Sequence, residues 1–107
     1  MKIPTASIAG TATRLVPANR KRTSLLINNL SGNLAVGIID NPTLTYDQKS
    51  VQITGGQNYG ISLGSAIVGY ENDGTPIYDN QRWVTGAWYL ISSTGDAQTI
   101  SYQEIFR

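Results

Sequence analysis

Short apolar stretches separated by turn residues run along most of this 107-residue chain. Val51-Gln52-Ile53-Thr54 and residues 59–63 alternate apolar with polar positions, which is typical of half-buried strands. Residues 23–28, 34–39 and 87–92 are continuous β-forming stretches, and a longer strand is expected over 98–106. Since no window shows a helical period, the pattern predicts an all-β chain of roughly seven to nine strands.

The residues between these stretches predict which strands pair. Ser31-Gly32-Asn33 separates 23–28 from 34–39, so we expect a hairpin there. Ser93-Thr94-Gly95-Asp96 likewise predicts that 87–92 and 98–106 pair with each other.

A third hairpin is expected between residues 67–70 and 76–78. Asn72-Asp73-Gly74 lies between them, and Asp-Gly tolerates the positive φ of a tight turn. Pro76 limits the second arm to an edge strand, because proline cannot donate a ladder hydrogen bond. Glu104 interrupts the alternation of the last strand and predicts a bulge or twist there. One domain, a β-sandwich or a barrel, follows from this spacing.

The amino-acid composition argues against several classes of function. Eight Lys and Arg against seven Asp and Glu leave a net charge of +1, without the basic excess of a protein that neutralises phosphates. The chain has no Cys and no His, which excludes thiolate nucleophiles, Ser–His–Asp triads and the commonest metal ligands. We therefore expect a non-enzyme with no cofactor and no metal site.

Charged residues make up only 14% of the chain, fewer than a free monomer usually carries on its surface. This favours a protein that covers part of its surface with other subunits, as in a homo-oligomer. The longest apolar stretches fall far short of the ~20 residues that span a bilayer, and the N-terminus lacks a signal-peptide core. We expect synthesis in a cytoplasm and no membrane partner.

Half of the positive charges fall in one short segment, namely Arg14, Arg20, Lys21 and Arg22. They can form a solvated loop before the strand at Thr23, or contact carboxylates of a neighbouring protein. Nucleic acid is the least favoured partner, because the rest of the chain is not basic.

Aromatic residues supply the other candidate contacts. Tyr70, Tyr78 and Trp83 lie in the irregular stretch 65–86 and either face a partner or form a local core, whereas Trp88 is predicted to be buried. The oxygen-rich residues 71–74 fit a hairpin turn better than a calcium loop, because the spacing of an EF-hand is missing.

Both ends of the chain carry motifs that resemble those of small virion proteins of tailed bacteriophages. Leu15-Val16-Pro17-Ala18-Asn19 followed by Arg22-Thr23-Ser24-Leu25-Leu26-Ile27-Asn28-Asn29 is similar to their L-x-P-A-N turn and R-x-S-L-x-I-x-N strand. Residues 85–95, TGAWYLISSTG, resemble their T-G-A-x-Y-x-I-S-S-x-G. Residues 64–83 depart from the pattern.

The resemblance implies a single antiparallel β-sandwich, jelly-roll-like, over residues 1–107. Residues 1–22 would be an N-terminal arm or edge segment, and a β-hairpin would be inserted around residues 65–83. The implied role is a capsid decoration or cement protein that bridges major capsid subunits in the virion, after synthesis in the host cytoplasm. The alternatives are a fibre, tail or neck component that binds a receptor or glycan through Tyr70, Tyr78 and Trp83, and a carboxylate-dependent hydrolase.

Overall fold

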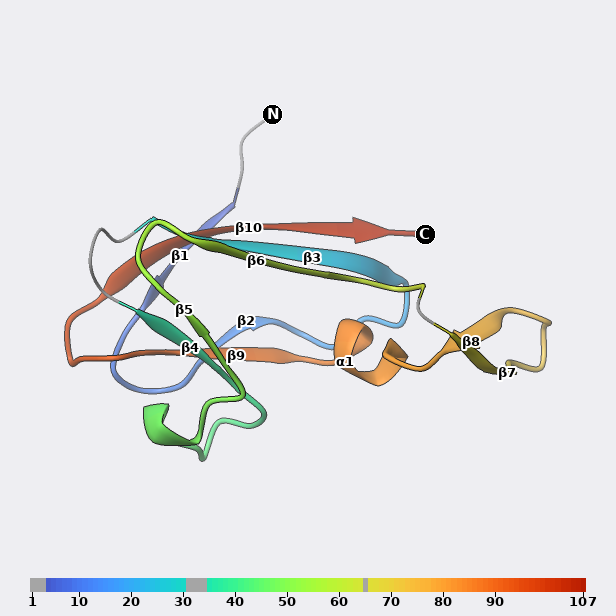
Figure 1. The fold of residues 1–107 in the computed structure, drawn as a ribbon, viewed down its shortest axis with the longest axis horizontal. Helices are drawn as coiled ribbons and strands as arrows, with labels where there is room; N and C mark the ends of the chain where they lie inside the picture. The colour runs from blue at the N-terminus through green and yellow to red at the C-terminus, as the bar shows by residue number, and fades with distance from the viewer. Residues whose placement is uncertain (1–3, 31–34, 65) are drawn as a thin grey trace.

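Two four-stranded antiparallel sheets form the body of the computed structural model, which describes residues 4–30, 35–64 and 66–107 (Figure 1). Sheet A has the order β1 (Thr5–Ile8), β10 (Gln98–Phe106), β3 (Arg22–Asn29), β6 (Asn58–Ser62). Sheet B has the order β2 (Thr13–Val16), β9 (Trp88–Ser92), β4 (Val36–Ile39), β5 (Val51–Ile53). The sheets face each other as two layers, which confirms the predicted β-sandwich.

Consecutive strands of the sandwich mostly lie in opposite sheets. The chain passes from β1 in sheet A to β2 in sheet B, then to β3 in A and β4 in B; β9 and β10 are likewise divided. Of the eight sandwich strands, β4 and β5 are the one consecutive pair joined within a sheet. This order is that of a jelly roll.

Two of the three predicted hairpins are therefore wrong. Residues 23–28 and 34–39 do not pair, because β3 bonds to β10 and β6 whereas β4 bonds to β9 and β5. Residues 87–92 and 98–106 are separated in the same way. A turn signal marks where the chain reverses, but a reversal within a sheet and a crossing between sheets use the same turn residues. Ser31-Gly32-Asn33 itself lies outside the described residues.

The core lies between the sheets and is built from the inward residues of both. In β3 the buried Leu25, Ile27 and Asn29 alternate with half-buried positions, as expected for a strand with one face inward. They meet buried residues of the other layer, including Trp88 and Leu90 of β9. Each buried Leu or Ile stabilises the fold by about 2 kcal/mol.

Several local elements were not expected. β1 and β2 occupy an edge of sheet A and of sheet B, but each has four residues, which is too short for alternation to be recognised. The 3-10 turn η1 (Tyr46–Gln48) and the helix α1 (Gln81–Thr85) are too short for a helical period to be recognised in the sequence. The described residues contain ten strands rather than seven to nine.

The inserted hairpin is present where it was predicted. Strands β7 (Ile67–Tyr70) and β8 (Pro76–Tyr78) form a separate two-stranded sheet, and Gly74 has a φ of +88° in the turn. The irregularity predicted near Glu104 is confirmed as well, because the register of β10 against β3 shifts between Ile105 and Phe106. Figure 1 shows the hairpin projecting from one end of the sandwich.

The side chain of Arg22 is fully buried and joins four segments of the chain. Its Nε lies 2.9 Å from Oε2 of Glu104, as does its Nη2, so the two side chains form a charged pair. Nη1 donates to the carbonyl oxygens of Val84 and Gly86 at 3.0 and 2.8 Å, and Nη2 donates to the carbonyl of Pro17 at 2.6 Å. The guanidinium thus ties β3 to β10, α1 and the β2–β3 loop.

Replacing the Arg22 guanidinium should make the folded protein less stable. We expect Arg22→Met to lower the free energy of unfolding by about 3–5 kcal/mol, because the Glu104 carboxylate and three carbonyls lose their donor. Urea denaturation measures the change, and Arg20→Met at a side chain that is 79% exposed is the matched control, with an expected change within about 0.5 kcal/mol. Equal losses in the two variants would contradict the role given to Arg22.

Candidate interaction site

The basic residues that are neighbours in sequence are separated in the structure. Arg14 lies on the edge strand β2 and its side chain is exposed. Arg20 and Lys21 are exposed in the β2–β3 loop. The prediction that Arg22 contacts a partner is wrong, because its side chain has no exposed surface and is already bonded within the chain.

Arg20 and Lys21 lie beside the turn of the hairpin. Together with Glu71, Asp73, Thr75 and Arg107 they line a hollow of about 340 Å³. Nη2 of Arg20 approaches Oε2 of Glu71 at 3.9 Å, which is a long and exposed ion pair. Such a pair adds little stability, so acidic and basic side chains remain available around the turn of the hairpin.

The turn at the tip of the hairpin is held by hydrogen bonds of its own residues. The Glu71 amide donates to the carbonyl of Thr75, and the Thr75 amide donates to Oδ1 of Asp73 at 3.0 Å. Hydrogen bonds from the side chain and the amide of Thr75 lower the pKa of the Asp73 carboxyl group. The turn is therefore stabilised above the ordinary pKa of Asp and loses this contribution as the pH falls through the lowered pKa.

These observations agree with a structural turn in residues 71–74. The described part of the chain contains no group of three acidic, His or Cys side chains that could hold a metal ion.

The strands of the hairpin expose large apolar side chains. Ile67, Val68 and Tyr70 are 49%, 66% and 66% exposed. Among the described strands, β7 and β8 bond only to each other, so the hairpin extends neither sheet of the sandwich. The C-terminal end of β10, with the exposed Ile105 and Phe106, lies at the same end of the long axis (Figure 1).

Of the six large hydrophobic residues that are exposed in the described part of the chain, five thus gather at this end, which we call the hairpin end. Leu30, the sixth, follows β3 at its opposite end. Exposed apolar groups concentrated in one place indicate a contact surface rather than ordinary surface composition.

The three candidate aromatic residues have different surroundings. Tyr70 is exposed on β7, and Tyr78 is half-buried on β8. Trp83 is half-buried, and its ring packs against that of Trp88 with centroids 4.7 Å apart. The Trp88 indole donates to the carbonyl of Trp83 at 3.0 Å, so Trp83 belongs in part to the core.

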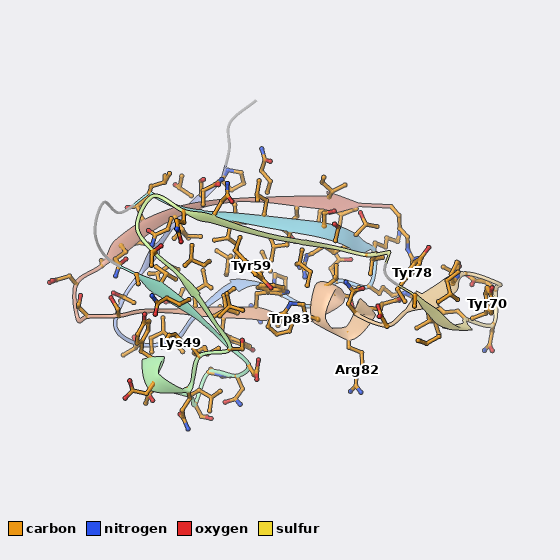
Figure 2. All side chains as sticks on the ribbon, viewed as in Figure 1. Lys49, Tyr59, Tyr70, Tyr78, Arg82 and Trp83 are labelled. Carbon is orange, nitrogen blue, oxygen red and sulfur yellow. The ribbon has the colours of Figure 1, made fainter. Side chains whose placement is uncertain are left out.

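A groove of about 720 Å³ lies between α1 and sheet B, and we call it the Trp83 groove. Its walls include Trp83, Ala87, Tyr89, Arg82 and Asp40. In Figure 2, Trp83 points from α1 toward the sandwich and Arg82 points away from it. Within the described residues, the side chains of Arg82 and Asp40 have no hydrogen-bond or ion-pair partner. The groove has the volume of a small-ligand site, and its lining includes the Arg82 guanidinium as a donor and the Asp40 carboxylate as an acceptor.

Sequence reasoning missed Asp40 and Arg82, because they lie far apart in sequence and only β4 and α1 bring them to one groove. It also missed Ile67 and Val68. A signal for them was present, since the hairpin strand IVGY carries apolar residues on both faces and no sheet was predicted to cover it.

The two aromatic environments predict different effects on stability. Trp83→Ala should lower the free energy of unfolding by about 2 kcal/mol, because it removes the ring packed on Trp88. Tyr70→Ala should change it by no more than about 0.5 kcal/mol, since that ring is exposed. Thermal and urea denaturation of the two variants measure this, and a large loss for Tyr70→Ala would show that the hairpin packs more closely than described.

No protein-family model, no curated protein and no solved structure matches this chain. No helix in the described ranges is long and apolar enough to cross a membrane. The function of the chain therefore has to be inferred from its own residues, geometry and motifs.

Proposed function

We propose that this chain is a non-enzymatic structural protein of a tailed-bacteriophage virion, a capsid decoration or cement protein that binds and bridges major capsid subunits. The observation that carries the proposal is the projecting hairpin, whose Ile67, Val68 and Tyr70 side chains are exposed beyond the sandwich. The motif resemblance of both chain ends supplies the virion context, and the jelly-roll sandwich agrees with it.

The composition of the hairpin end suits a protein partner. Aromatic and branched apolar side chains form the centre of stable interfaces, and a polar rim surrounds them. Here the exposed apolar residues of β7 are followed by Glu71 and Asp73 in the turn, with Arg20 and Lys21 beside them. The exposed basic residues of the original cluster would then serve as rim contacts.

A cement protein acts by binding alone. A ligand that binds only the assembled shell stabilises it by mass action, since separating the subunits must also break the contacts of the ligand. Many equivalent sites on a symmetric shell multiply a modest affinity when bound copies also touch one another. The chain has neither His nor Cys, and the Trp83 groove is lined by a single carboxylate, whereas glycoside hydrolysis uses a pair.

Removing the hairpin should abolish particle binding without unfolding the sandwich. The Asp79 amide donates to the Ala66 carbonyl at 2.9 Å, so residues 67–78 can be replaced by an Asn-Gly turn between neighbouring ends. We expect this variant to keep its melting temperature within a few degrees and to lose co-sedimentation with capsids of the phage that encodes the chain.

Val68→Ser/Tyr70→Ser is the matched variant with an intact hairpin, and it should weaken binding at least roughly tenfold. Full binding by the hairpin-less variant would overturn the hairpin as the anchor. Particles that keep their heat stability without the protein would overturn the cement role.

A second candidate is a fibre, tail or neck component that binds a receptor or glycan. The Trp83 groove favours it, because a half-exposed indole beside an unpaired guanidinium and an unpaired carboxylate can stack on a sugar ring and bond its hydroxyls.

A double substitution in the Trp83 groove distinguishes the cement role from the receptor- or glycan-binding role. Asp40→Ala/Arg82→Ala changes two exposed side chains and should leave the fold intact. If the groove binds a glycan, this variant loses adsorption to host cells and signal on a glycan array, while capsid binding is unchanged. Unchanged adsorption would remove the second candidate.

A further inference from the structure

Strand β6 forms one open edge of sheet A, and β3 is its one partner among the described strands. The Leu63 amide donates to the Thr23 carbonyl at 2.9 Å, and the Asn29 amide donates to the Gln57 carbonyl at the same distance. In an antiparallel ladder, hydrogen-bonded residues recur at every second position. The odd-numbered residues of β6 therefore bond to β3, and the even-numbered residues direct their backbone groups away from the sheet.

Asn58, Gly60 and Ser62 are these outward residues, and all three are exposed. The Asn80 side chain donates to the Ser62 carbonyl at 2.9 Å, which leaves that oxygen a second lone pair. The N–H and C=O groups of Asn58 and Gly60 have no protein partner in the described ranges. This edge thus presents a row of free backbone donors and acceptors, which an additional strand can satisfy.

The other three edges carry features that discourage pairing. β2 has Arg14, a register shift between Arg14 and Val16, and Pro17 directly after it. β5 has only three residues, and β1 has four and follows Pro4. β6 has five residues, no charge, no proline and an unbroken register with β3. Natural sheets protect their edges by such features. β6 lacks them, so it is the edge best suited to pair with another strand.

The strand residues on the outward face of sheet A carry no charge. Arg22 and Glu104 are the charged residues of β1, β10, β3 and β6, and both side chains lie on the other face. A second sheet A can therefore lie beside the first without bringing like charges together. An acidic or basic partner peptide would find no complementary charge there.

We propose that two copies of this chain pair through β6, antiparallel about a two-fold axis at Gly60, to form a continuous eight-stranded sheet. In this register Gly60 bonds to the partner's Gly60, and Asn58 bonds to the partner's Ser62. The edge is self-complementary because its outward residues are spaced evenly about Gly60, which is the condition for an isologous two-fold contact. The inference stands on the backbone edge and is independent of the virion role.

Side chains at positions 58 and 62 lie on the outward face and test the register directly. Asn58→Lys/Ser62→Lys places like charges opposite each other across the axis, twice by symmetry, and should weaken the dimer roughly tenfold. Asn58→Lys/Ser62→Glu places opposite charges at the same positions and should keep or strengthen the dimer. Thr5→Lys/Ser7→Lys adds the same charge to the exposed β1 edge of the same face and should leave the dimer unchanged.

Sedimentation equilibrium of the full chain over micromolar to millimolar concentrations measures the mass against the 11.6 kDa of one copy. Hydrogen exchange should slow at the amides of Asn58, Gly60 and Ser62 as the dimer forms. A wild-type chain that stays monomeric throughout this range overturns the proposal. The proposal is also overturned if Thr5→Lys/Ser7→Lys lowers the dimer affinity as much as Asn58→Lys/Ser62→Lys does. Equal dimer affinities for Asn58→Lys/Ser62→Glu and Asn58→Lys/Ser62→Lys would overturn it as well.

Discussion

The buried guanidinium of Arg22 is the interaction on which the arrangement of this molecule depends. A charge removed from water is tolerated only when it is paired and fully hydrogen-bonded. Here the partners are the Glu104 carboxylate and the carbonyls of Pro17, Val84 and Gly86. These groups come from β10, the β2–β3 loop and the α1 region, so the requirement to satisfy one side chain fixes the end of sheet A against the segment that leads into β9.

This anchoring explains how the sandwich can carry a projecting hairpin. Since α1 and the residue after it are held by Arg22, the chain returns to β9 at a fixed place whatever lies between β6 and α1. The hairpin then contributes exposed surface rather than core, and its sequence is free to change with the partner. Loops on a rigid scaffold commonly carry function for this reason. The proposed capsid contact uses a part of the chain that contributes no residue to the hydrophobic core.

The proposed contacts differ in chemistry and lie on different parts of the molecule. The hairpin end offers apolar side chains with charges around the turn of the hairpin, which suits a distinct protein partner. The β6 edge offers backbone groups and a charge-free face, which suits another copy of the chain. A protein with both contacts can link its own copies while each copy holds a different subunit, and this combination is what bridging a shell requires.

The sequence by itself determined the strands from β3 to β10, the inserted hairpin, the bulge near Glu104 and the burial of Trp88, because alternation, Asp-Gly turns and large apolar side chains act locally. Only the tertiary structure decided that β3 and β4, and β9 and β10, lie in opposite sheets, since the same turn residues serve both connections. It also decided that Arg22 is buried while Arg20 is exposed, and that Asp40 and Arg82 line the same groove. The sequence does not show which of two neighbouring charged residues is buried, because the environment of each is set by strands that pair from distant parts of the chain.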